Sequence, residues 1–257
     1  MAKLGNFPPS GDYAFPYRDL VETQVLVTGG RGTLGRAICR GFASLGAHVW
    51  SLDTSAVTPA DETHPKIQQR VADVRHRESL VAVQKEIART EGLDVLVNAH
   101  GLQIRSDFAG CDEETWMTLT DINLNGVYRC CQVFGEPMRA RGGAIVSIGS
   151  VNGVVVSGKG TPYGVQKAAV SHMTKIMAVE WAPLVRVNAI APTAIPSGMT
   201  RDLFANPDYV NAKTQSIPLK RTGTEEDIVH AVMFLASSAS GLVTGHTLMM
   251  DGGLSLV

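Results

Sequence analysis

Short apolar segments recur along the chain, and most of them end at a small or polar residue. The first, residues 24–28, is rich in β-branched residues and is typical of a strand buried on both faces of a sheet. Similar segments follow at residues 48–52, 67–72, 94–97, 144–148, 186–191 and 247–250. The hydrophobic pattern therefore predicts seven strands.

Between these strands, apolar residues recur at the three- and four-residue spacing of an amphipathic helix. Leu34, Ile38, Phe42 and Leu45 show this spacing first, and helical patterns cover residues 77–91, 113–140, 163–181 and 224–237. Strands that alternate with helices favour a parallel sheet covered on both faces. The sequence therefore predicts a single-domain α/β protein with a Rossmann-type, doubly wound parallel sheet.

Two segments fall outside this regular pattern. Residues 1–20 are rich in Pro, Gly and aromatic residues, and we expect an N-terminal arm laid over the domain formed by residues 21–257 or over a neighbouring subunit. Between residues 196 and 217 the pattern loosens into short helices with Asn206-Pro207 between them. An irregular insert after a strand end predicts a substrate lid.

A glycine-rich turn, Gly29-Gly30-Arg31-Gly32-Thr33-Leu34-Gly35, joins the first strand to the first helix. Glycine is needed where the backbone takes a positive φ and where it approaches a pyrophosphate, which then rests at the helix N-terminus. Asp53 follows the second strand, where a carboxylate can hold the hydroxyls of an adenosine ribose. This order predicts a dinucleotide-binding unit.

Polar residues follow several of the predicted strands. Asp53, Asp73, Asn98 and Ser150 each stand at or just after a strand end. The ligand site of a doubly wound sheet lies at the carboxyl ends of its strands. We therefore expect these side chains to surround one cleft.

Tyr163 and Lys167 lie four residues apart in a predicted helix and so share one face. A positive charge roughly 4 Å from the phenol, at an effective dielectric constant near 20, is worth about 4 kcal/mol, or ~3 pKa units. We therefore expect Lys167 to lower the pKa of Tyr163 far enough for proton transfer near neutral pH. A surface tyrosine and lysine on an amphipathic helix is the simpler alternative.

The composition fits a globular protein of one large domain. The chain has 257 residues, 44% of them hydrophobic and 18% charged, with a formal net charge of −1. We expect no nucleic-acid or membrane partner, and the absence of an apolar leader favours the cytoplasm. Cys39, Cys111, Cys130 and Cys131 lack the spacing of a metal site, so we expect reduced packing residues and no metal.

Taken together, these motifs resemble the short-chain dehydrogenase/reductase family over nearly all of residues 25–253. The resemblance rests on the glycine-rich turn, Asp73-Val74, Asn98 to Gly101, Asn123, Ser150 with Tyr163 and Lys167, Arg186-Val187-Asn188 with Pro192, and the stretches 243–245 and 251–253. It implies a catalytic tetrad of Asn123, Ser150, Tyr163 and Lys167. Tyr163 would transfer the proton, Ser150 would bind the reacting oxygen, and Asn123 would anchor a water that links Lys167 to solvent.

The resemblance also implies a nicotinamide dinucleotide as cofactor, with Ile195 and Ser197 at its carboxamide. The full set of expected cofactor contacts is Gly29, Arg31, Gly32, Thr33, Leu34, Asp53, Asp73, Val74, Asn98, Gly101, Tyr163, Lys167, Ile195 and Ser197. Asp53 favours NAD because its carboxylate repels a 2′-phosphate, whereas Arg31 would attract one. We expect the two side chains to interact, so that Asp53 partly neutralises Arg31 and NAD is preferred.

Several residues depart from the family pattern. Thr33 stands where compact members carry glycine, and His100 gives Asn-Ala-His-Gly in place of the commoner Asn-Asn-Ala-Gly. His100 is a candidate for contacting substrate, with packing as its alternative. Residues 101–105 look most like sugar-acid and polyol dehydrogenases such as gluconate 5-dehydrogenase, which makes Arg105 a candidate carboxylate ligand.

We therefore expect an NAD-dependent oxidoreductase that interconverts a secondary alcohol and a ketone on a small hydroxy or keto substrate, a sugar acid or polyol. A 3-oxoacyl-thioester reductase that uses NADP is one alternative, and Asp53 argues against it. A dinucleotide sensor without activity is the other, and the intact tetrad argues against that. Relatives of this kind are usually homotetramers, and we expect Ala168, Ala169, Val170, Ile176 and Ala178 to pack against a second subunit.

Overall fold

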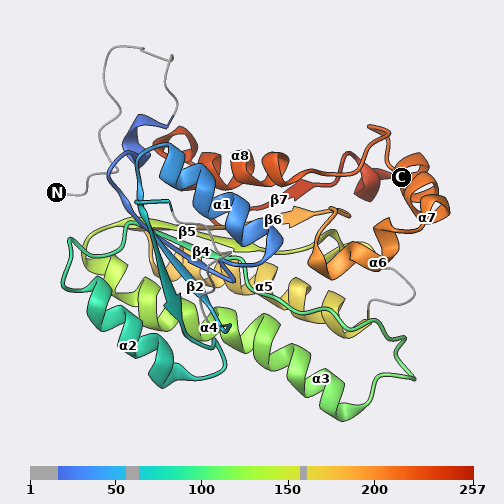
Figure 1. Cartoon of the computed structure of the whole chain (residues 1–257), viewed down its shortest axis with the longest axis horizontal. Helices are drawn as coiled ribbons and strands as arrows, with labels where there is room; N and C mark the ends of the chain where they lie inside the picture. The colour runs from blue at the N-terminus through green and yellow to red at the C-terminus, as the bar shows by residue number, and fades with distance from the viewer. Residues whose placement is uncertain (1–16, 56–63, 157–160) are drawn as a thin grey trace.

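A computed structural model describes residues 17–55, 64–156 and 161–257 of the chain. Its core is one parallel sheet in which the strands lie in the order β3-β2-β1-β4-β5-β6-β7 (Figure 1). The strands are β1 (Gln24–Thr28), β2 (His48–Asp53), β3 (Ile67–Val71), β4 (Val95–Asn98), β5 (Gly143–Ile148), β6 (Val185–Pro192) and β7 (Thr247–Met250). The doubly wound sheet and its seven predicted strands are confirmed.

Helices cover both faces of this sheet. They are α1 (Thr33–Ser44), α2 (Arg77–Ile87), α3 (Glu113–Thr120), α4 (Gly126–Cys130), α5 (Thr161–Glu180), α6 (Arg201–Phe204), α7 (Pro207–Ser216) and α8 (Glu225–Ala236). In Figure 1, α1 and α8 lie on one face, whereas α2, α4 and α5 lie on the other. The single-domain, two-sided architecture follows from this arrangement.

The central strands are apolar on both sides, which is why their sequences show no alternation. Val25 and Val27 of β1 pack into the cluster beneath α1 and α8, while Leu26 between them packs into the cluster beneath α2 and α5. All three side chains are fully buried. Two hydrophobic cores, one on each face, therefore fix the sheet between the helix layers.

One helical run fills the region where the sequence predicts a single helix over residues 113–140. It begins where the Asp112 carboxylate accepts a hydrogen bond from the backbone N–H of Thr115 at 2.7 Å. The run is interrupted by π-helical turns at Asp121–Asn125 and Cys131–Gly135, on either side of α4. Such turns widen the helix locally and often mark functional sites.

The strand order reverses between β1 and β4. Ligands of doubly wound sheets bind at such a switch point, at the carboxyl ends of the strands. Here the loops after β1 and β4 touch, because a Cβ atom placed on Gly29 would lie 2.6 Å from the Cα of His100. The topology therefore brings the glycine-rich turn against the Asn-Ala-His-Gly segment.

The structure describes one of the two irregular segments in full and the other only in part. Residues 1–16 of the predicted arm fall outside the described residues, and Leu20, in the short helical turn that follows, is buried. Between residues 196 and 217, α6 and α7 are separated at Asn206, whose side chain caps α7. Among the residues that the structure describes, no helix is long and apolar enough to cross a membrane.

A partly buried arginine joins β6 to the end of α8. The two terminal nitrogens of Arg186 donate hydrogen bonds to the carbonyl oxygens of Leu235, Ala236 and Ser237 at 2.8, 3.1 and 2.9 Å. These carbonyls belong to the last turn of the helix, where they have no intrahelical partner and carry partial negative charge. Arg186 therefore ties the C-terminal helix to the sheet.

We expect Arg186→Met to lower the free energy of unfolding by about 3 kcal/mol, because it removes the charged hydrogen bonds to Leu235 and Ser237, which keep only Ser240 as a donor among the described residues, and takes the side-chain donor from the carbonyl of Ala236. Urea denaturation followed by circular dichroism measures this change. Arg139→Met is the matched control, since Arg139 is half exposed and lies 3.9 Å from Glu136. That control should change stability by less than about 0.5 kcal/mol. Equal midpoints for the two variants would contradict the role given to Arg186.

Candidate active site

The glycine-rich turn brings the start of α1 close to the sheet. Gly29 has a φ of 67°, and a Cβ atom on Gly35 would lie 2.1 Å from the carbonyl oxygen of Gly29. The turn is closed by a hydrogen bond from the backbone N–H of Gly32 to the same oxygen, at 3.0 Å. Its glycines therefore form a narrow cradle at the N-terminus of α1, which is suited to a pyrophosphate.

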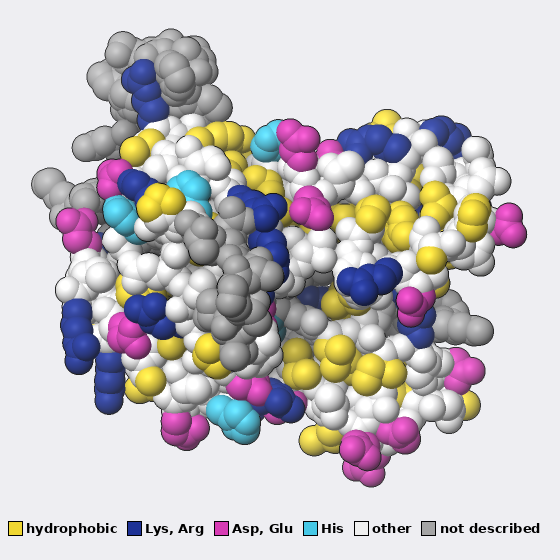
Figure 2. All heavy atoms as spheres, viewed as in Figure 1, with side chains coloured by type: hydrophobic (Ala, Val, Ile, Leu, Met, Phe, Trp, Pro, Cys, Tyr) yellow, Lys and Arg dark blue, Asp and Glu magenta, His cyan; other side chains and the backbone are white. Residues whose placement is uncertain are grey.

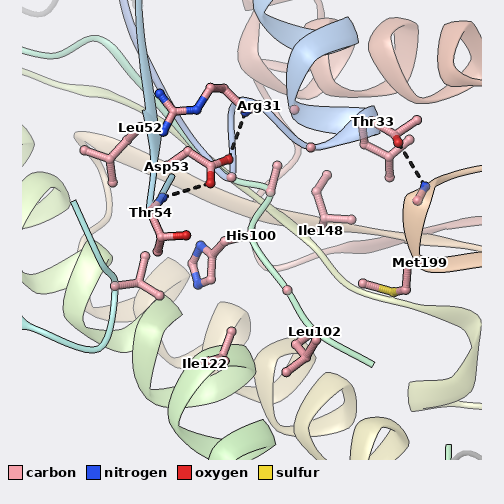
Figure 3. Close-up of a pocket in the computed structure, with 18 of the residues that line it drawn as sticks. Arg31, Thr33, Leu52, Asp53, Thr54, His100, Leu102, Ile122, Ile148 and Met199 are labelled. Atoms are coloured by element: carbon pink, nitrogen blue, oxygen red, sulfur yellow. Dashed lines mark hydrogen bonds between the residues drawn. The ribbon is translucent and has the colours of Figure 1, made fainter. Parts of the chain in front are cut away.

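The carboxylate of Asp53 binds backbone N–H groups of the glycine-rich turn and of the residue that follows Asp53 itself (Figure 3). Its carboxylate accepts hydrogen bonds from the backbone N–H groups of Arg31 at 3.0 Å and Thr54 at 2.8 Å. The Arg31 side chain instead donates from Nε to Ser55, at 3.3 Å. Among the described residues, the Arg31 and Asp53 side chains therefore form no direct hydrogen bond or ion pair, and it is the backbone N–H of Arg31 that contacts the carboxylate.

Asp73 and Val74 line the same cleft, and Asp73 is held there by its neighbour Arg75. The two side chains form an ion pair of 2.6 Å, and the Arg75 guanidinium holds the pKa of Asp73 below its ordinary value. Asn98 behaves differently. It is buried, and its amide donates to the hydroxyl of Ser147 at 3.1 Å, so its side chain points into the sheet and does not line the cleft.

His100 is packed behind the turn. Its Nδ1 lies 2.6 Å from the hydroxyl of Thr28, and Gly126 approaches the other side of the ring. Burial, followed by the positive charge of Lys167, lowers the pKa of His100 to about 3, so the ring is neutral at pH 7. His100 lines the first cleft but not the second cavity described below, where the catalytic serine of the family pattern lies.

Asn123 is fully buried in the first π-helical turn. Its amide oxygen accepts from the backbone N–H of Leu102 at 2.9 Å, and its amide nitrogen donates to the carbonyl of Leu102 at 2.8 Å. This paired contact attaches the loop after β4 to the helix. A Cβ atom on Gly101, the preceding residue, would lie 3.1 Å from the Asn123 oxygen and 3.8 Å from the Nζ of Lys167.

Tyr163 and Lys167 share the buried face of α5, as their spacing predicts. The Nζ of Lys167 donates to the carbonyl of Ile148 at the end of β5, at 2.6 Å, and lies 5.5 Å from the centre of the Tyr163 ring. Burial lowers the pKa of Lys167 to about 8. Lys167 therefore remains mostly charged at pH 7 while it is almost completely removed from solvent.

The pKa of Tyr163 moves opposite to the predicted direction. Burial raises it to about 12, and the contact with Ser150 only partly opposes this shift. The sequence argument placed the Lys167 charge beside the phenol oxygen, whereas the structure directs the ammonium to the Ile148 carbonyl. Desolvation of the phenolate therefore dominates over the attraction that the spacing alone suggested.

Ser150 follows β5, and its hydroxyl accepts a hydrogen bond from the backbone N–H of Asn152 at 3.2 Å. It lies on the wall of a second cavity of about 580 Å³, together with Arg105 and Ile195. The first cleft has a volume of about 820 Å³ and contains the glycine-rich turn, Asp53 and Lys167. On the face drawn in Figure 2, Lys and Arg side chains gather beside the hollow at the centre of the molecule.

The two cavities share part of their walls. Leu34, Ile148, Tyr163, Ser197 and Met199 line both of them. Ser197 is fixed through Thr200, whose hydroxyl also donates to the carbonyl of Ile195. Tyr163 is the one titratable side chain common to both sets of lining residues, so it stands where contents of the two cavities would meet.

Thr33, the unusual residue of the turn, contacts the start of the predicted lid. Its hydroxyl accepts a hydrogen bond from the backbone N–H of Gly198 at 3.1 Å (Figure 3). The sequence analysis missed several wall residues of the cavities, namely Arg75, Met199, Tyr209 and Lys213. Of these, Tyr209 and Lys213 had a usable signal, because their four-residue spacing puts both on one face of α7.

A metal centre finds no support in this geometry. In residues 17–55, 64–156 and 161–257, no three His, Cys, Asp or Glu side chains are grouped closely enough to hold a metal ion. The four cysteines are free, and Cys39, Cys130 and Cys131 are buried.

Comparisons with known proteins agree with this arrangement. A family model described as Enoyl-(Acyl carrier protein) reductase matches residues 30–255. The chain is 35% identical to a galactitol 2-dehydrogenase (L-tagatose-forming) of Cereibacter sphaeroides, over 90% of this chain and 94% of that protein. It is 36% identical to a 3-oxoacyl-(acyl-carrier-protein) reductase of Chlamydia muridarum, over 92% and 98% of the two chains.

A solved structure shares the fold over almost its whole length. The gluconate 5-dehydrogenase of Burkholderia cenocepacia, in complex with NADP and tartrate, superposes with a TM-score of 0.86 and 29% identity, covering 95% of this chain and 99% of that one. With the glycine cradle, the Tyr163–Lys167 face and these relatives together, the chain belongs to the short-chain dehydrogenase/reductase family, whose oxidoreductases bind a nicotinamide dinucleotide.

Proposed function

We propose that this protein is an NAD-dependent dehydrogenase that interconverts a secondary alcohol and a ketone on a sugar acid or polyol. The observation that carries the proposal is the position of Tyr163 in the wall shared by the two cavities. A dinucleotide in the first cavity and a small substrate in the second would meet at this phenol. The reaction needs a proton-transferring group at that junction.

Each residue of the tetrad has a different role in the proposed reaction. Tyr163 takes the hydroxyl proton in oxidation and returns it in reduction. Ser150, in contact with Tyr163, donates a hydrogen bond to the substrate oxygen and stabilises the charge that develops there. Lys167 places a positive charge 5.5 Å from the centre of the phenol ring, whereas burial opposes the phenolate and the contact with Ser150 favours it. Asn123 holds the loop at Leu102 in place.

The residues of the first cavity fit a nicotinamide dinucleotide. The narrow glycine cradle at the start of α1 accepts the pyrophosphate, since a Cβ on Gly35 would close it. Asp53 reaches the adenosine ribose, while Gly101, Tyr163 and Lys167 line the end that takes the nicotinamide ribose. Ile195 and Ser197 are the candidates for the carboxamide, and His100 packs behind the cofactor. When bound, the nicotinamide supplies or accepts the hydride.

NAD is favoured over NADP by the charge at Asp53. Its carboxylate keeps two backbone donors and would repel the roughly double negative charge of a 2′-phosphate. Arg31 acts in the other direction, because the terminal nitrogens of its guanidinium have no hydrogen-bond partner among the described residues. The Burkholderia gluconate 5-dehydrogenase was solved with NADP, so the likeness to that structure does not favour NAD. We give Asp53 the larger effect because it lies at the ribose position.

The substrate class follows from the relatives and from Arg105. Galactitol and gluconate occur in the names of two relatives, one similar in sequence and one in structure, and Arg105 lines the second cavity. Residues 196–217, which bring Ser197, Met199 and Tyr209 to the cavities, serve as the lid.

A 3-oxoacyl-thioester reductase is the second candidate, because the 36% identity to the Chlamydia enzyme is as high as that to the polyol dehydrogenase. Asp53 argues against it if that activity uses NADP.

Tyr163→Phe should reduce kcat at least about 100-fold while the affinity for NAD changes little, because only the proton-transferring oxygen is lost. Steady-state oxidation of a polyol or sugar acid and NAD titration by fluorescence measure the two effects. Tyr128→Phe, which alters a half-exposed tyrosine on α4, is the control. If Tyr163→Phe retained more than about a tenth of the wild-type kcat, Tyr163 would not be the proton-transfer group.

We expect the unmodified enzyme to prefer NAD over NADP at least ~10-fold in kcat/KM, which corresponds to about 1.4 kcal/mol. Asp53→Ala should narrow or reverse this preference, because the repulsion of the 2′-phosphate is removed while Arg31 remains. Glu91→Ala, a change at an exposed acid in the turn that follows α2, controls for net charge. Equal efficiency of the unmodified enzyme with both cofactors would assign the choice to Arg31.

We propose a homotetramer whose contact surface on α5 differs from the one expected from the sequence. Val170 and Ala178, which were expected to face a neighbouring subunit, are buried in their own domain. The exposed apolar stripe of α5 consists instead of Val165, Ile176 and Val179, which are 49%, 47% and 80% exposed. These positions share one helical face, so they can pack against a second α5.

Sedimentation at micromolar concentration should give the mass of four chains. Val179→Glu should dissociate the assembly, because it places a charge in an apolar contact, whereas Leu242→Glu, at a fully exposed residue outside α5, should not. A monomer for the unmodified protein would exclude the tetramer, and an unchanged mass for Val179→Glu would exclude this surface.

A further inference from the structure

The second cavity has an uneven charge. Among the residues that the structure describes, two cations line it, Arg105 and Lys213, and no aspartate or glutamate does. The first cleft, by comparison, contains Asp53 and Asp73 beside its arginines. A cavity with positive charge only favours an anionic ligand.

Lys213 is placed by α7 and faces the cavity. It lies one helical turn after Tyr209, and both side chains line the cavity, whereas Asp208, next to Tyr209, does not. Lys213 is partly buried, and among the described residues no hydrogen bond or ion pair engages the side chain of either Lys213 or Arg105. Arg221, by contrast, forms an ion pair with Asp227 at 2.6 Å.

The desolvation of Lys213 is not compensated within the chain. Burial is the cause that lowers its pKa, and no acidic neighbour opposes the shift. A cation that is partly buried without a partner costs free energy, and a ligand carboxylate would recover part of it through a charge-assisted hydrogen bond. The cavity itself, about 580 Å³, is in the size range of small-molecule sites.

We propose that Lys213, with Arg105, binds a carboxylate of the substrate, so that the enzyme acts on a polyhydroxy acid in preference to the corresponding neutral polyol. This inference rests on the proposed function, because it places the reacting alcohol at Ser150 and Tyr163. Arg105 comes from the loop after β4 and Lys213 from α7, so the carboxylate joins the lid to the body of the domain. Lys213 is then the residue that selects the acid.

Galactonate and galactitol provide the test, since they differ at C1, where one carries a carboxylate and the other a hydroxymethyl group. Lys213→Met should lower kcat/KM for galactonate at least about tenfold, mainly through KM, and change that for galactitol less than about twofold. Lys213→Arg, which keeps the charge, should retain most of the efficiency with galactonate. Lys85→Met, at an exposed lysine of α2, is the matched control and should change neither substrate.

Equal losses for galactonate and galactitol in Lys213→Met would overturn the inference, because they would indicate damage to the lid. So would an unmodified enzyme that prefers galactitol. Galactitol 1-phosphate is the third substrate in the test. If the unmodified enzyme preferred it, and if Lys213→Met lowered kcat/KM most for this compound, the bound anion would be a phosphate. The carboxylate assignment would then be wrong.

Equilibrium binding separates this inference from the proposed activity. In the Tyr163→Phe enzyme with NAD present, calorimetry should show galactonate binding that weakens at least about tenfold when Lys213→Met is added. If neither compound is oxidised by the active enzyme but this difference in binding is found, the proposed activity fails and the carboxylate site stands. If galactonate is oxidised but its binding does not depend on Lys213, the activity stands and the site is wrong.

Discussion

The buried ammonium of Lys167 is the constraint on which the site depends. It is 2% exposed and has one described acceptor, the carbonyl oxygen of Ile148 at the end of β5, at 2.6 Å. A charge in such surroundings persists only with a partner, so this bond fixes the first turns of α5 against the edge of the sheet. Tyr163, one turn earlier, is thereby held at the wall common to both cavities, beside Ser150.

Polar groups around this bond are incompletely paired. Within the described part of the chain, Asn98 Oδ1, His100 Nε2 and Gln166 Oε1 are buried without a hydrogen-bond partner. Buried polar atoms are normally paired, and exceptions cost free energy. Here they lie near the carboxyl ends of the central strands, where the sheet topology places the ligand site. Other unpaired polar atoms lie elsewhere in the described fold, such as Gln69 Oε1 in β3 and Gln84 Oε1 in α2, while the apolar clusters on both faces stabilise the sheet.

The two cavities differ in charge because different elements build them. The first cleft takes its aspartates from the ends of β2 and β3, which suits a ligand with ribose hydroxyls. The second takes its cations from the loop after β4 and from α7, which is not part of the sheet. Substrate selection is thus assigned to segments that can change without disturbing the sheet, as is common for loops carried by a rigid framework. Thr33 connects the two regions through its bond to Gly198.

The strands, helix faces and turn that depend on residues close together in the chain could be predicted from the amino-acid sequence. Apolar segments and helical spacing gave all seven strands, and the spacing of Tyr163 and Lys167 gave their common face, because strand and helix periodicity are local properties. The glycine-rich turn and Asp53 could also be predicted from the sequence, because a short continuous segment of strand, turn and helix positions them.

Side-chain direction, burial and pKa depend on segments that are far apart in the chain, and they could be read from the folded structure alone. Asn98 turns to Ser147, 49 residues away, and His100 to Thr28, 72 residues away, so neither side chain's direction follows from its own neighbours. The pKa of Tyr163 rises because desolvation by the whole domain outweighs the one charge that spacing reveals. Val170 and Ala178 are buried, and Lys213 reaches the second cavity, because the packing of complete helices sets which face is covered. The burial of a side chain and the choice of its hydrogen-bond partner depend on packing between distant segments, so a local sequence pattern does not predict them.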